Sequence, residues 1–155
     1  MTKEKRPIIA LSGGFNPARK NHVAMILDAA KIGDVVIILN SDEWCTRHAW
    51  NQQLFSKYEN REAVLRHIPG VTDVILADDA DDADDTVCNA LKLLKPDFFG
   101  NGGNRDINNT PEVQLCKKLG IGMIWYLGNT TNENVLQEAD TYLSIAIAKV
   151  YQNNA

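Results

Sequence analysis

The feature that most constrains the fold is an alternation of short apolar runs with segments of helical periodicity. Five runs have the length and composition of buried strands, at residues 8–11, 35–39, 74–77, 98–99 and 123–127. Apolar residues recur every three or four positions in the segments that follow them, at residues 23–31, 58–67, 86–94, 111–119 and 134–152. Strands that are apolar on both faces need cover on both, so the alternation predicts a doubly wound α/β sheet of about five parallel strands.

Several helix ends can be read from the sequence. Lys95-Pro96 ends the third helical segment, and Thr110 is a candidate cap for a helix that starts at Pro111 and ends before Gly120. The last helical segment carries a near-heptad apolar stripe, which indicates packing on its own domain, with a homodimer seam as the alternative. The stripe consists of Leu136, Ala139, Leu143, Ala146 and Val150.

Composition narrows the class of protein. The chain has 155 residues, 45% of them hydrophobic and 23% charged, as in an ordinary globular protein. Its net charge of −4 is local, because six of the eight residues at 78–85 are aspartate and the remainder carries +2. No basic stripe indicates nucleic-acid binding, no apolar run reaches membrane-spanning length, and no signal-peptide pattern is present. We therefore expect a cytoplasmic protein that binds neither nucleic acid nor a membrane.

Neither the cysteines nor the aspartates predict a metal site. Cys45, Cys88 and Cys116 are odd in number and lack metal-ligand spacing, so we expect reduced, packed thiols. The aspartates of 78–85 lack the spacing of a calcium loop, and a solvated acidic loop is the favoured interpretation.

The segment 12–22 has the pattern of a phosphate-binding turn. Its glycines, Gly13 and Gly14, lie between an apolar strand and an apolar-periodic helix, and His22 lies at the start of that helix. Free amide groups and the dipole of a helix start favour an anion, and glycine lets the backbone approach phosphate oxygens. A glycine pair at such a turn is also common in proteins that bind no phosphate, so the pattern needs support from the rest of the chain.

That support comes from the segments after three further strands, which are also small or polar. Residues 40–48 include Trp44 and Arg47, and residues 100–106 form a second glycine-rich loop that contains Arg105. Residues 128–133 supply hydroxyls and amides. Because ligands bind beyond the carboxyl ends of parallel strands, these segments are expected on one rim.

The order of these motifs resembles the cytidylyltransferase-like nucleotidyltransferase family. The resemblance rests on 13–17 with His22, on 40–44, on 59–61 entering a helix, and on 97–103. It covers nearly the whole chain and is nearest to the heptose-phosphate adenylyltransferase and glycerol-3-phosphate cytidylyltransferase branch. It implies a Rossmann-like fold, with residues 1–155 as a single nucleotidyltransferase-like domain.

The resemblance also implies an activity. A nucleotidyl group would pass from ATP or CTP to a phosphorylated sugar or alcohol, with release of pyrophosphate and with Mg²⁺ accompanying the triphosphate. The partners would be a nucleoside triphosphate and an anionic small acceptor. The choice of base stays open, with residues 101–112 favouring ATP slightly.

Site residues are carried over position by position. His22 matches the second histidine of the H-x-G-H signature, and Arg19 stands at the first, so these two are the candidate catalytic residues. The candidate nucleotide-binding residues are Gly13, Gly14, Phe15, Asn16, Gly102, Gly103, Thr130 and Thr131. The candidate substrate-binding residues are Trp44, Arg47, Arg61, Asn104 and Arg105, with a salt bridge as the alternative role for Arg61 and a helix cap as the alternative for the threonines.

The chain departs from the family pattern at several of these positions. Arg19 replaces a histidine and Asn21 the signature glycine, while Asn16 and Asn104 stand where the family has acidic residues. Residues 129–132 replace a serine cluster. Arg19 is compatible with an active enzyme, because a guanidinium can hold phosphate in two places. The alternatives are a nucleotide-binding homologue without turnover and an interaction subunit.

Overall fold

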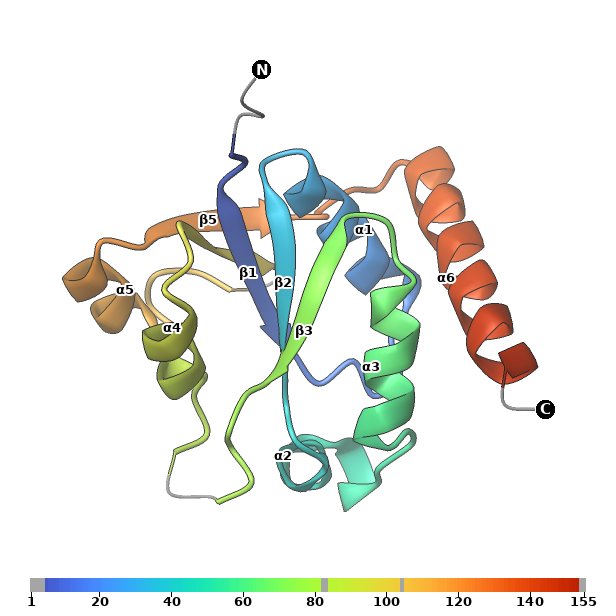
Figure 1. Ribbon diagram of the computed structural model, residues 1–155, viewed down its shortest axis with the longest axis horizontal. Helices are drawn as coiled ribbons and strands as arrows, with labels where there is room; N and C mark the ends of the chain where they lie inside the picture. Colours follow the sequence, from blue (N-terminus) through green and yellow to red (C-terminus); the bar gives the residue numbers. More distant parts are fainter. Residues whose placement is uncertain (1–4, 82–83, 104, 154–155) are drawn as a thin grey trace.

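A five-stranded parallel sheet forms the centre of the molecule, in the strand order β3-β2-β1-β4-β5. The computed structural model describes residues 5–81, 84–103 and 105–153. The strands are β1 (Ile8–Gly13), β2 (Asp34–Leu39), β3 (Val71–Leu76), β4 (Phe98–Gly102) and β5 (Gly122–Leu127). All four neighbouring pairs are parallel, so the carboxyl ends of the strands lie along one rim (Figure 1).

Helices cover both faces of the sheet, as the apolar runs predicted. One face carries α1 (Lys20–Ala30), α3 (Tyr58–Arg66) and α6 (Glu133–Asn153), and the other carries α4 (Cys88–Leu94) and α5 (Val113–Leu119) (Figure 1). The first core includes Ile9, Leu11 and Ile37, and the second is centred on Phe99, both built from fully buried side chains. The fold is therefore a Rossmann-like α/β sheet.

The last helix packs on its own chain. Its buried side chains are Ala139, Leu143, Ala146 and Val150, and it lies against α1. The homodimer stays a prediction. Four apolar side chains of α6 remain exposed, namely Val135, Ile145, Ile147 and Tyr151, and the last two line a small cavity together with Phe15 and Phe55.

Two helices differ from the prediction. Residues 42–48, for which no helix was predicted, form helix α2 (Asp42–His48), whose first turn is capped by the hydroxyl of Ser41, which accepts a hydrogen bond from Trp44 N at 3.0 Å. A short 3-10 turn, η1 (Trp50–Gln52), follows it. Helix α5 starts two residues later than expected, with Glu112 at its N-cap, because Thr110 is buried and its hydroxyl bonds Asn109 Oδ1 instead.

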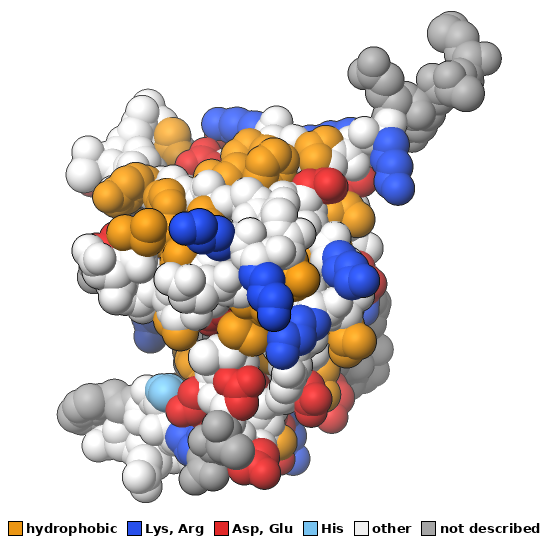
Figure 2. Space-filling model, turned by 90° about the vertical axis from the view of Figure 1, so that its left-hand side faces the viewer, with side chains coloured by type: hydrophobic (Ala, Val, Ile, Leu, Met, Phe, Trp, Pro, Cys, Tyr) orange, Lys and Arg blue, Asp and Glu red, His pale blue; other side chains and the backbone are white. Residues whose placement is uncertain are grey.

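The aspartate segment is less solvated than expected. Asp79 is buried, and its carboxylate accepts hydrogen bonds from Asn40 Nδ2 and Ser41 N. Asp85 binds Arg47 at 2.8 Å and His48 at 3.0 Å, so the segment is fastened to α2. Acidic side chains gather toward the lower end of the molecule in Figure 2, while basic ones lie over the middle of that face. The picture agrees with a locally concentrated negative charge.

No helix in the described part of the chain is long and apolar enough to cross a membrane. The free cysteines Cys45 and Cys116 are buried and Cys88 is half-buried, as expected for packed thiols. Burial raises the pKa of the Cys116 thiol to about 11, with smaller contributions from Cys88 and Glu112, so this sulfur stays protonated.

Candidate functional site

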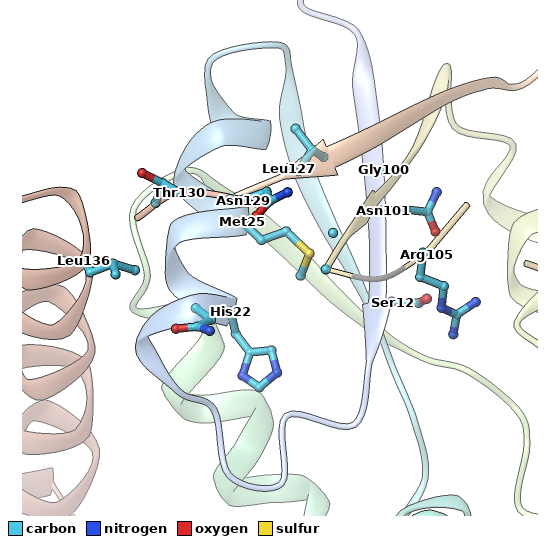
Figure 3. A pocket seen from close by; sticks show the side chains of 14 residues that line it. Ser12, His22, Met25, Gly100, Asn101, Arg105, Leu127, Asn129, Thr130 and Leu136 are labelled. Atoms are coloured by element: carbon cyan, nitrogen blue, oxygen red, sulfur yellow. The ribbon is translucent and has the colours of Figure 1, made fainter. Parts of the chain in front are cut away.

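A cavity of about 380 Å³ opens at the carboxyl ends of β1, β4 and β5. In Figure 3, His22 and Thr130 lie on its α1 side, and Ser12, Asn101 and Arg105 lie on the opposite side. The size is that of a small-ligand site. The cavity is lined by Ser12, Asn21, His22, Met25, Gly100, Asn101, Gly102, Gly103, Arg105, Leu127, Gly128, Asn129, Thr130 and Leu136.

His22 is held in one orientation by the start of α1. Its Nδ1 accepts a hydrogen bond from Arg19 N at 2.9 Å, and its ring meets the edge of the Phe15 ring at a centroid distance of 5.0 Å. An Nδ1 that accepts must be unprotonated, which leaves Nε2 as the N–H donor of a neutral imidazole. Burial, and then the charge of Arg19, lower the pKa of His22. The ring is therefore neutral at pH 7 and can donate one hydrogen bond.

The glycine turn contacts His22 through the ring of Phe15. Gly13, Gly14 and Phe15 are not among the cavity-lining residues, although Ser12 before them is. A Cβ on Gly13 would lie 3.0 Å from the Phe15 ring, and one on Gly14 would lie 3.1 Å from Cys45 Sγ. The two glycines thus allow close packing of the turn against Phe15 and α2. Their contact with phosphate stays a prediction.

Asn16 does not face the cavity, contrary to the prediction that it binds nucleotide. Its Oδ1 accepts from Phe55 N at 2.8 Å and from Ser56 N at 2.9 Å, and its Nδ2 donates to Gln53 O at 3.3 Å. Both lone pairs of the oxygen are used in this way. Asn16 ties the glycine turn to the loop before α3.

Arg61 makes the salt bridge that was the alternative to substrate binding. Only 1% of its side chain is exposed. It donates to the carbonyls of Ser56, Gly14 and Asn40 at 2.7–2.8 Å and to Asp42 Oδ1 at 2.6 Å. Its guanidinium N–H groups thus donate to other atoms of the protein, as expected for a structural arginine.

Arg19 lies at a neighbouring opening. This second cavity, between the start of α1 and α6, shares Asn21 and His22 with the first and is lined on its other side by Asp140 and Leu143. Arg19 does not line the first cavity, to which it contributes only through the hydrogen bond from its backbone N–H to His22. The two candidate catalytic residues both line this second opening, but only His22 also lines the first cavity.

Trp44 and Arg47 face the aspartate segment and do not line the cavity. The Trp44 ring stacks on His48 at 4.2 Å, and its Nε1 donates to Asp85 O at 3.0 Å. Arg47 donates to the carbonyls of Ala80 and Asp79 at 2.8 and 2.7 Å. The Trp44 ring also lies near Gly14, where a Cβ would be 3.3 Å away, so it packs beside the glycine turn and outside the cavity lining, and the predicted contact of both residues with substrate stays a prediction.

The loops after β4 and β5 do reach the cavity. Gly102, Gly103 and Arg105 line it from the first loop, and Thr130 lines it from the second. Thr130 Oγ1 also accepts from Asn132 N at 3.0 Å, while Thr131 is exposed and outside the lining. Asn104 lies outside the described residues.

The sequence reasoning missed several lining residues. Asn101 is buried at the end of β4, where its Nδ2 donates to Phe99 O at 3.3 Å. Gly128 has φ +71, and a Cβ there would lie 2.5 Å from Met25 N, so the β5 loop can lie directly on α1. Asn101 and Gly128 belong to segments that the sequence analysis predicted to lie at the ligand-binding rim. Nothing in their residue types distinguished them from their neighbours in those segments.

The cavity lining offers little to hold a cation. Arg105 is the one permanent cation among its described lining residues, and none of those residues is a carboxylate. The described residues include no group of three or more potential metal-ligating His, Cys, Asp and Glu residues. Protein-bound Mg²⁺ is usually anchored by one or two carboxylates. The lining therefore does not fit a metal site built by the protein, and magnesium would arrive on the triphosphate as part of the substrate.

Comparison with known proteins gives two distant relatives by sequence. None of the known protein-family profiles matches the chain. It is 27% identical over 117 residues to D-beta-D-heptose 1-phosphate adenylyltransferase from Bordetella bronchiseptica, covering 74% of this chain and 69% of that protein. It is 29% identical over 118 residues to bifunctional protein HldE from Streptomyces coelicolor, covering 76% of this chain but only 24% of that protein.

A solved structure has the same fold. The lipopolysaccharide core biosynthesis protein from Thermoplasma volcanium superposes with a TM-score of 0.61 at 17% identity, covering 77% of this chain and 95% of that one. At this identity the likeness concerns the fold alone.

Proposed function

We propose, from the resemblance of this chain to the cytidylyltransferase-like nucleotidyltransferases, that it transfers a nucleotidyl group from ATP or CTP to a phosphate monoester and releases pyrophosphate. One relative is named a heptose 1-phosphate adenylyltransferase, which supports a sugar phosphate as the acceptor. In this reaction an acceptor phosphate oxygen attacks the α-phosphorus in line, and the bond from that phosphorus to the bridging oxygen of pyrophosphate breaks. No covalent intermediate with the protein is needed.

The α1 side of the cavity suits the triphosphate. The first turn of α1 lines it through Asn21 and His22, and Thr130 supplies a hydroxyl on the same side (Figure 3). A helix start favours phosphate, and donors fixed before the reaction cost no reorganisation as charge develops. His22 Nε2–H would donate to a phosphate oxygen while Nδ1 stays bonded to the backbone.

The neutral, oriented imidazole of His22 is the observation that carries the proposal. A ring fixed by Arg19 N, packed on Phe15 and kept unprotonated by burial is a defined donor at the cavity wall. A surface histidine would have no such constraints.

The test is pyrophosphate release by the full chain. We expect release with MgATP or MgCTP and a panel of sugar 1-phosphates, measured by a coupled phosphate assay. His22→Gln should remove it without lowering triphosphate affinity by more than a few fold, as calorimetry would measure. Absence of triphosphate binding in the wild-type chain would refute the proposal.

A nucleotide-binding protein without turnover is the second candidate, and Arg19 favours it. His22 lines both openings, whereas Arg19, at the first signature position, lines only the second, so one expected phosphate donor is missing from the wall of the first cavity. Only binding that is stronger in the transition state accelerates a reaction. Triphosphate binding without pyrophosphate release across the panel would select this candidate, and Arg19→His would then be expected to restore some release.

A further inference from the structure

One oxygen of the buried Glu112 carboxylate lacks a hydrogen-bond partner among the described residues. This oxygen is Oε2, and only 4% of the side chain is exposed. It occupies the N-cap of α5 but makes no side-chain capping bond there. Burying a carboxylate costs free energy unless a nearby opposite charge compensates it, so we expect a cation near Glu112.

Arg105 supplies a positive charge near the Glu112 carboxylate. Its Nη1 lies 3.7 Å from Glu112 Oε2, and this is the one ion pair found for either residue within the described part of the chain. The Arg105 side chain is 44% exposed and lines the cavity across from His22 (Figure 3). Glu112 is 4% exposed and is not among the cavity-lining residues. The guanidinium is thus placed between a buried anion and the open cavity.

We propose that Arg105 binds the phosphate of the acceptor and that Glu112 is the positioning residue that holds its guanidinium toward the cavity. This inference rests on the proposed function for the identity of the ligand. Arginine has several rotatable bonds, and a fixed planar fork loses less entropy when it binds phosphate with two parallel hydrogen bonds. The chain supplies no second permanent cation among the described lining residues, so the position of this one decides how an incoming dianion is held.

The alternative role for Glu112 predicts a result of opposite sign. If its charge acted only through the field, it would repel the acceptor, and Glu112→Gln would tighten phosphate binding. If it positions Arg105, the same isosteric change frees the guanidinium and weakens binding.

The experiment follows the Arg105 Nε–Hε NMR signal of the full chain during titration with inorganic phosphate and with glucose 1-phosphate. We expect both to shift this signal, and Arg105→Gln to weaken phosphate binding about tenfold or more, as loss of a charged hydrogen bond implies. We expect Glu112→Gln to weaken binding about threefold to tenfold, by an amount comparable with the loss of one ordered side chain. In the Arg105→Gln background, Glu112→Gln should have no further effect.

Controls separate positioning from general charge and from unfolding. Glu59→Gln removes an exposed carboxylate from α3, away from the cavity lining, and should leave phosphate binding unchanged. Arg105→Lys keeps the charge without the planar fork and should bind more weakly than wild type. Arg105 is exposed, so its variants test the proposal even if thermal melts show that Glu112→Gln unfolds.

Three results would overturn the inference: tighter binding by Glu112→Gln, an equal loss in the Arg105→Gln background, or no shift of the Arg105 signal with either phosphate. MgATP calorimetry on the same samples keeps the proposed function separate. If wild type binds phosphate through Arg105 but binds neither MgATP nor MgCTP, the proposed function fails and the anion site stands. If the triphosphate binds and Arg105 is silent, only this inference fails.

Discussion

The two ring nitrogens of His22 lie in different environments. Nδ1 closes the first turn of α1 by accepting from Arg19 N, and Nε2 is the nitrogen left for a ligand. The His22 side chain therefore has a structural role at Nδ1 and a proposed chemical role at Nε2. An alanine substitution would remove both. Glutamine is the more informative replacement, because a residue at this third helical position can reach back to the N-cap amide with a side-chain oxygen.

His22→Gln is expected to keep stability and lose activity. We expect unfolding free energy close to wild type for His22→Gln, and a loss of about 0.5–2 kcal/mol for His22→Ala, the usual cost of a lost cap. Both should lower the rate of pyrophosphate release by about 10²–10³, as removal of one fixed donor does elsewhere. Urea unfolding and the pyrophosphate assay measure the two effects. Equal activity in His22→Gln and wild type would contradict the role of Nε2.

The lowered pKa of His22 makes stability depend on pH. The unfolded chain takes up a proton at the ordinary value of 6.5, and the folded chain takes it up only at lower pH. The unfolded state thus binds more protons in this window, so the free energy of unfolding falls as pH drops below about 6.5 and levels off below the folded pKa. Urea unfolding at pH values from about 7.5 to about 5, the range in which histidines usually titrate, measures this effect. The free energy of unfolding should fall with pH in wild type and should fall less in His22→Gln.

At the scale of elements, Arg61 connects three segments that are far apart in the sequence. It belongs to α3 and binds the glycine turn, the end of β2 and the start of α2 through Gly14, Asn40 and Asp42. The position of the turn behind His22 consequently depends on a helix that lies some forty residues later.

Arg61→Ala is expected to destabilise the protein by about 3–5 kcal/mol, because it leaves buried carbonyls and a carboxylate without their donor. Arg66→Ala removes a 45% exposed arginine from the same helix, paired with Glu62 and Asp73, and should cost about 0–1 kcal/mol. Denaturant unfolding compares the two. Similar losses for both would show that the buried network contributes little.

The contact between the β5 loop and α1 gives a second element-scale test. Gly128 and Gly103 both have positive φ, +71 and +60, but a Cβ on Gly128 would meet the α1 backbone at 2.5 Å and one on Gly103 would meet nothing within 4 Å. We expect Gly103→Ala to cost about 1–2 kcal/mol from backbone conformation alone. Gly128→Ala should cost more, since α1 must also move. A circular dichroism melt of each variant measures the difference, and an equal loss would contradict the close approach.

The sequence predicted strands and helices better than it predicted contacts. Apolar runs located all five strands, most clearly β1 and β2, whose side chains are mostly buried. Helix α2 was missed, although Ser41 before two acidic residues and Arg47-His48 at the end are the charges that favour a helix. Asn16 and Arg61 could not be assigned, because their partners lie about twenty to fifty positions away and only the folded chain brings them together.

At the scale of the whole molecule, the cavity lies across the rim of the sheet, with α1 on one side and the β4 loop on the other (Figure 3). A ligand there contacts segments from both halves of the chain. Bound ligand should consequently stabilise the fold as a unit, beyond the loops that it touches.

Nucleotide is expected to raise global stability by mass action. At a free MgATP concentration one hundred times Kd, the free energy of unfolding should rise by about 2.7 kcal/mol. Hydrogen exchange should slow most at the start of α1 and in the loops after β4 and β5, and least in α3 and β3, which do not line the cavity. Protection centred on α3 would place the ligand elsewhere.

The enclosure of Arg61 has a consequence for chemical labelling of the native protein. Dicarbonyl reagents that attack guanidinium groups need a free, accessible arginine, and Arg61 is 99% enclosed with its nitrogens bonded. Arg105 is open to solvent at the cavity and Arg19 is exposed at the neighbouring one. Mass spectrometry of the labelled, folded chain should therefore find adducts on Arg19 and Arg105 but not on Arg61, and shielding of one of them by a phosphate ligand would map its binding site without a crystal.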